Sequence, residues 1–172
     1  MIRIVLCCYV VVALCLHPGP GTAQSASGAA TAKVLVSLAL ITLSDLDMGG
    51  FSPGAGTVTV DAKSPGAGKF RATGSSGYGL TVTYPGSVTL TSGVNSLSLT
   101  VSVLGNNTDN QPSSLAVPSG STVYLGRPPR GQGQPPRVRG NDFFFWFGGT
   151  TTIGVAQPAG SYTGTFTLSV QY

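Results

Sequence analysis

Charged residues are scarce in this chain, at 8% of 172 residues, and glutamate is absent. The three cysteines (Cys7, Cys8 and Cys15) and the single histidine (His17) all lie near the start of the chain. The rest of the chain therefore has no residues for a disulfide, a His/Cys zinc site, a thiol nucleophile or an imidazole-based triad. We expect no catalytic residues, no metal site and no cofactor.

The first 23 residues have the order typical of a secretory signal peptide. Arg3 precedes an apolar run, 4–16, which is followed by a Pro/Gly break and the small residues at 21–23. The apolar run is too short to span a membrane. We predict cleavage after Ala23, export with no membrane span left, and a location outside the cell, on its surface or in the periplasm.

Glycine (25) and proline (12) are frequent enough to interrupt any long helix. Leu, Ile, Val and Phe nevertheless make up roughly a quarter of the chain, above the ~20% typical of disordered chains. Short alternating segments recur about every ten residues, which favours an all-β sandwich or barrel. We predict one antiparallel β-sandwich domain, 24–172, with about 7–9 strands.

Three segments shape this prediction. The clearest strand is 162–172, where apolar residues and glycine alternate with Thr, Ser and Gln. The wholly aromatic strand 143–147 is expected to be buried on both faces and to be followed by a bend at Gly148–Gly149. The stretch 104–120 shows little alternation and is expected to be a long loop.

An Arg/Pro/Gly-rich segment, 126–140, is expected to project into solvent as an extended loop. It carries the only cluster of charge: Arg127, Arg130, Arg137 and Arg139. Guanidinium groups bind sulfated or uronic sugars, and the nearby aromatics at 143–146 suggest stacking on a sugar ring. The alternative is that the arginines keep the surface soluble while the aromatics fill the core. Export argues against a nucleic-acid partner.

Residues 26–40 are first small and then alternately apolar, which suits an extended arm that pairs with an open sheet edge of another subunit. The alternative is that 34–43 pairs within its own domain. The candidate residues for subunit pairing lie in this arm and in the last strand: Val34, Val36, Leu38, Leu40, Phe166, Leu168, Val170 and Tyr172.

Asp45 and Asp47 would point the same way from an extended segment. Paired carboxylates act in acid/base catalysis or in calcium binding, but calcium requires six to eight oxygen ligands, and the local sequence supplies too few. We interpret both residues as turn residues whose carboxylates accept hydrogen bonds from backbone N–H groups.

Four pieces of sequence, 46–51, 56–60, 147–150 and 160–172, resemble the family of exported bacterial proteins catalogued as domain of unknown function 4402, which is similar to pilin-like and fimbrial adhesin domains. The likeness runs from about Val34 to Tyr172, and its most specific part is the last block. It implies an immunoglobulin-like sandwich outside the cytoplasm of a bacterium and supplies no activity. The segment 126–140 departs from the family pattern, so the resemblance says nothing about it.

Two hypotheses for function follow. The first is a non-catalytic structural or fimbria-like subunit that self-associates by strand pairing. The second is a monomeric extracellular module that binds anionic polysaccharide or another envelope polymer. An exported hydrolase ranks well behind both.

Overall fold

The computed structural model describes residues 31–126 and 140–172. These residues contain one short 3-10 helix, η1 (Gln111–Ser113), and no helix that is both long and apolar enough to cross a membrane. The strands are β1 (Ala39–Ser44), β2 (Gly56–Val60), β3 (Gly68–Thr73), β4 (Gly79–Thr83), β5 (Ser87–Ser92), β6 (Asn95–Asn106), β7 (Leu115–Ala116), β8 (Thr122–Tyr124), β9 (Asp142–Ile153) and β10 (Ser169–Gln171). The predicted all-β class is confirmed. The ten strands include the two-residue β7, which lies in the predicted 104–120 loop.

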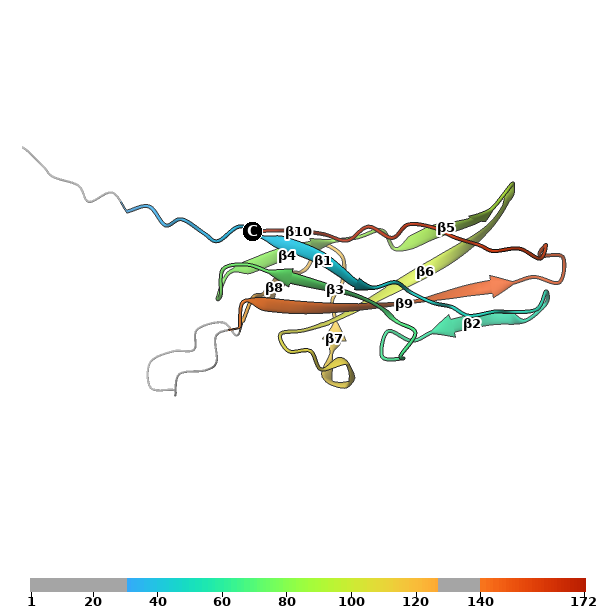
Figure 1. Ribbon diagram of the computed structural model, residues 1–172, viewed down its shortest axis with the longest axis horizontal. Coiled ribbons are helices and arrows are strands. Elements are labelled where there is room, and N and C mark those ends of the chain that lie inside the picture. The colour runs from blue at the N-terminus through green and yellow to red at the C-terminus, as the bar shows by residue number, and fades with distance from the viewer. Residues whose placement is uncertain (1–30, 127–139) are drawn as a thin grey trace, which may run out of the picture. The chain divides into compact units, whose positions relative to one another are not determined.

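The strands form two antiparallel sheets (Figure 1). The larger has the order β1-β3-β9-β6-β5, with β2 paired to β9 and β7 paired to β6. The smaller has the order β10-β4-β8. All strand pairs are antiparallel. By the strand order, β1 is an edge strand of the larger sheet and β10 is an edge strand of the smaller one.

The core is built from apolar side chains on the inner faces of both sheets. From β9 it takes Phe143, Phe145 and Phe147, and from β4 it takes Leu80 and Val82. Phe145, Leu80 and Val82 are completely buried. Burying such a side chain contributes ~1.5–3 kcal/mol relative to leaving it in water, so this aromatic strand is a principal source of stability.

The predicted bend at Gly148–Gly149 is wrong, because β9 continues through both glycines to Ile153. A side chain on Gly148 would meet the backbone of Val60 and Ala62, and one on Gly149 would meet the side chain of Leu99. The glycines therefore let two neighbouring strands approach β9 closely instead of turning the chain.

The predicted strand 162–172 has the expected faces but only a short ladder. Its alternation is real, since Leu168 is buried while Thr167 and Ser169 are exposed. The segment pairs with β4 only over Ser169–Gln171 and touches β5 through one bridge, Thr163–Thr91 (Figure 1). Its neighbour is interrupted between β4 and β5 by Tyr84–Gly86, where Pro85 supplies no N–H for a ladder hydrogen bond.

The first strand begins later than the sequence predicted. Strand pairing with β3 starts at Ala39, so 34–38 is not part of the sheet. The backbone N–H of Val36 donates to Ser75 Oγ (2.7 Å), and its carbonyl accepts from the Tyr172 hydroxyl (2.9 Å). Side chains thus take the place of a neighbouring strand at this point.

Candidate functional site

The described residues form an open groove of about 870 Å³. It lies between two irregular wall segments, 45–53 and 157–166. The first wall directly follows β1 and the second precedes β10, so the walls continue the edge strands of the two sheets. We call this cavity the groove.

The floor of the groove is apolar. Its side chains come from β5, β6 and β9, three neighbouring strands of the large sheet: Val88, Leu90, Leu97, Leu99, Phe147 and Ile153. Leu90 and Leu97 are only half-buried. On the rim, Phe51 is 42% exposed, so apolar surface faces water both in and beside the groove. Clustered apolar surface of this kind marks an interaction site more often than scattered residues do.

Both walls carry backbone groups without hydrogen bonds to the described part of the chain. On the first wall these backbone groups belong to Leu46, Met48, Gly50 and Phe51. At the end of the second wall and just beyond it, the backbone of residues 164–168 also makes no hydrogen bond to the described part of the chain. An edge with free N–H and C=O groups is a template for pairing with another strand. The groove therefore combines the two requirements for strand addition, open backbone beside an apolar floor.

The charged residues that line the groove are Asp45 and Asp47. The Asp47 carboxylate accepts a hydrogen bond from the Gly49 N–H (2.9 Å), which confirms the predicted turn role for this residue. Asp45 is exposed, and its side chain makes no hydrogen bond to a described residue. Across the described ranges, no three His, Cys, Asp or Glu residues gather in a group that suits a metal ion.

The eight candidate pairing residues fall into two groups. Val34 (94%) and Val36 (62%) are exposed. The other six lie against their own domain. Leu38, Leu40, Phe166 and Val170 are partly buried against the core, Leu168 is buried within it, and Tyr172 contacts the Tyr78 ring edge-to-face at 6.0 Å. Of these eight residues, only Phe166 lines the groove.

The candidate arginines Arg127, Arg130, Arg137 and Arg139 lie outside the described residues. The aromatics beside them are covered. Trp146 is 2% exposed and Phe144 is half-buried, and the ammonium of Lys69 lies over both rings at 5.3–5.6 Å from their centroids. Sugar stacking on Trp146 would require the covering residues to move.

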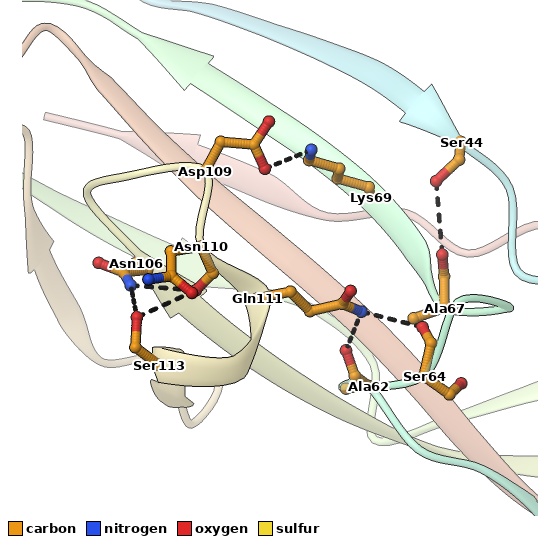
Figure 2. Close-up of polar contacts among 10 residues, drawn as sticks. All are labelled: Ser44, Ala62, Ser64, Ala67, Lys69, Asn106, Asp109, Asn110, Gln111 and Ser113. Atoms are coloured by element: carbon orange, nitrogen blue, oxygen red, sulfur yellow. Dashed lines mark hydrogen bonds and ion pairs between the residues drawn. The ribbon is translucent and has the colours of Figure 1, made fainter.

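The segment that follows β6 makes polar contacts with β3 and with the loop between β2 and β3 (Figure 2). The side-chain amide of Gln111 donates to the carbonyls of Ala62 (2.8 Å) and Ser64 (2.9 Å). Lys69 pairs with Asp109 at 2.6 Å. A small polar hollow of about 370 Å³ beside this pair includes Trp146 in its lining. These contacts hold the segment in place, and we assign them a structural role.

Sequence reasoning missed most of the groove. Its floor residues lie in short apolar segments that the sequence shows, but the two walls are more than 100 residues apart in sequence. The available signal was the frequency of Gly, Pro and Ser in 49–56 and 158–161, a composition typical of irregular backbone.

Fold and groove together define an all-β sandwich with an open seam between the edges of its two sheets. Residues 38–172 match the family model described as Domain of unknown function (DUF4402), so the chain belongs to this family. No curated protein matches the chain.

Proposed function

We propose that this protein is a non-catalytic, fimbria-like structural subunit that is exported by a bacterium and self-associates at the cell surface. The observation that supports the proposal is the groove, where an apolar floor lies between two edges with unpaired backbone. An incoming strand would gain main-chain hydrogen bonds along a wall and bury alternate side chains on the floor. The groove lacks the paired acid and base in unlike environments that hydrolytic chemistry uses.

The test is the size of the exported form, 24–172, measured by sedimentation over a wide concentration range. We expect oligomers or filaments that grow with concentration. Leu97→Glu places a charge on the groove floor and should reduce association at least tenfold. Leu115→Glu is the matched control, because Leu115 is 75% exposed on β7, outside the groove.

Melting curves of both variants would establish that they remain folded. A protein that stays monomeric at every concentration, while retained on an anionic polysaccharide column, would instead support the binding-module hypothesis. Equal association of the two Leu→Glu variants would contradict a role for the groove.

A further inference from the structure

The groove has the form of a site for one additional strand. We propose that its occupant is the segment before Val36 from a second copy of this chain. This inference rests on the proposed function, since it names the partner at the same site. The incoming segment runs beside the second wall and pairs with its open backbone from Gly164 onward, with alternate side chains on the apolar floor.

The pattern of this segment fits such a floor. From Ala26 to Val36 every second residue is Ala, Gly or Val, and most residues between them are polar. A strand with this alternation presents one small apolar face and one polar face. The largest apolar side chain on that face before Val36 is Val34, which is 94% exposed in its own molecule, so its burial in a second copy would remove apolar surface from water.

The geometry at Val36 explains why the occupant comes from another copy. Both backbone groups of Val36 are held, the N–H by Ser75 and the carbonyl by Tyr172. Tyr172 is six residues beyond Phe166, about 20 Å further along the extended chain, and it does not line the groove. The segment therefore leaves its own domain at a point well away from the groove.

The segment 24–35 is also long enough to line the groove, and its charge is opposite to that of the groove. The twelve residues 24–35 reach about 40 Å when extended, more than the roughly 33 Å that the ten residues 157–166 of the second wall would span. Lys33 is the only charged residue between Gln24 and Ser44. The charged residues lining the groove are both acidic, Asp45 and Asp47. A lysine near these carboxylates would favour binding and fix the register of the added strand.

The first experiment removes the segment. Deleting 24–35 keeps Val36, its two hydrogen bonds and all of β1. We expect a monomer whose melting temperature stays within a few degrees of that of the 24–172 chain. Oligomers that persist without 24–35 would overturn this inference and leave the proposed function standing. A 24–172 chain that never associates would overturn both.

The second experiment tests the charge contact. Lys33→Glu and Asp45→Lys should each weaken association several-fold, because each places like charges together. The two changes combined in one chain should restore most of it. Asp45 suits this swap because its side chain has no hydrogen bond to break among the described residues. Additive losses in the double variant would contradict the contact.

The third experiment identifies the occupant directly. Residues 24–172 contain no cysteine, so single cysteines report one contact at a time. Chains with Val34→Cys are mixed with chains carrying Gly50→Cys or Thr165→Cys on the two walls, or Leu115→Cys as the control. We expect a disulfide-linked dimer with at least one wall variant and none with Leu115→Cys. The absence of a link to either wall would overturn the inference. A chain that carries Val34→Cys together with one of the wall cysteines, and that forms the disulfide only within itself, would also overturn it.

Discussion

The hydroxyl of Tyr172 donates a hydrogen bond to the carbonyl of Val36 at 2.9 Å, joining the β10 end of the chain to the segment just before β1. The same oxygen accepts from the Ser75 N–H at 2.7 Å. One phenol therefore joins the end of β10, in the smaller sheet, to the two segments that flank the β1–β3 pair of the larger sheet.

Tyr172→Phe keeps the aromatic contact with Tyr78 and removes only the hydroxyl. Each hydrogen bond contributes ~0.5–1.5 kcal/mol net, so we expect the free energy of unfolding to fall by about 1–2 kcal/mol. Urea unfolding measures this change. The matched control is Tyr124→Phe, because Tyr124 is about as exposed as Tyr172 (45% against 42%) but its hydroxyl makes no hydrogen bond to a described residue, so this variant should lose less than about 0.5 kcal/mol. Equal losses of unfolding free energy in the two variants would show that the hydrogen bonds of the Tyr172 hydroxyl do not stabilise the fold.

The first and last strands show what a sequence pattern can and cannot predict. Alternation correctly assigned inward and outward faces in 162–172, because burial acts on each side chain locally. It did not predict that the ladder is short, because that depends on the break at Tyr84–Gly86 in a neighbouring segment. In the same way, 34–38 alternates like a strand, yet at Val36 its backbone bonds to the side chains of Ser75 and Tyr172.

The groove was less predictable than the fold. The fold follows from short apolar segments, each of which can be recognised by itself. The groove is defined by an absence of pairing between 45–53 and 157–166, and its apolar floor is also part of a regular sheet. Only the three-dimensional arrangement shows that no other segment of the described chain covers this part of the apolar face of the large sheet.

Close packing at β9 gives a second prediction. Gly148→Ala would push a methyl group against the backbone of Val60 and Ala62, which cannot rotate away as a side chain can. Overpacking of this kind costs ~1–3 kcal/mol or more. We expect Gly148→Ala to lower the melting temperature by several degrees. Gly154→Ala serves as the control, since nothing lies within 4 Å of its added carbon and its φ is not positive. A Gly148→Ala protein as stable as the control would show that β2 moves aside at little cost.

The contacts in Figure 2 allow a part-buried amide to be compared with a more exposed ion pair. Gln111→Leu removes two hydrogen bonds and leaves the part-buried carbonyls of Ala62 and Ser64 without this partner, which should cost about 1–3 kcal/mol. Asp109→Ala breaks the shorter contact, at 2.6 Å, but the Asp109 side chain is 57% exposed. Exposed ion pairs contribute ~0–1 kcal/mol, so the smaller loss is expected here. Denaturant unfolding of the two variants measures the difference, and a larger loss for Asp109→Ala would reverse this ranking.

Tyr84 makes stability depend on alkaline pH. Burial raises the pKa of its phenol above the ordinary 10.0, although a backbone hydrogen bond involving Ser119 acts in the opposite direction. The hydroxyl donates to the Val117 carbonyl at 2.6 Å, a bond that ionisation would break. Because the folded protein holds this proton more tightly than the unfolded chain, the contribution of Tyr84 to the free energy of unfolding is complete below pH 10 and is lost as pH rises through the raised pKa.

We therefore expect the melting temperature to fall above pH 10 more steeply for the natural chain than for Tyr84→Phe, which has no such proton. The measurement is a series of melting curves between pH 8 and 11.5, with Tyr124→Phe as the exposed control. Parallel curves for the natural chain and Tyr84→Phe would show that this phenol is not coupled to folding.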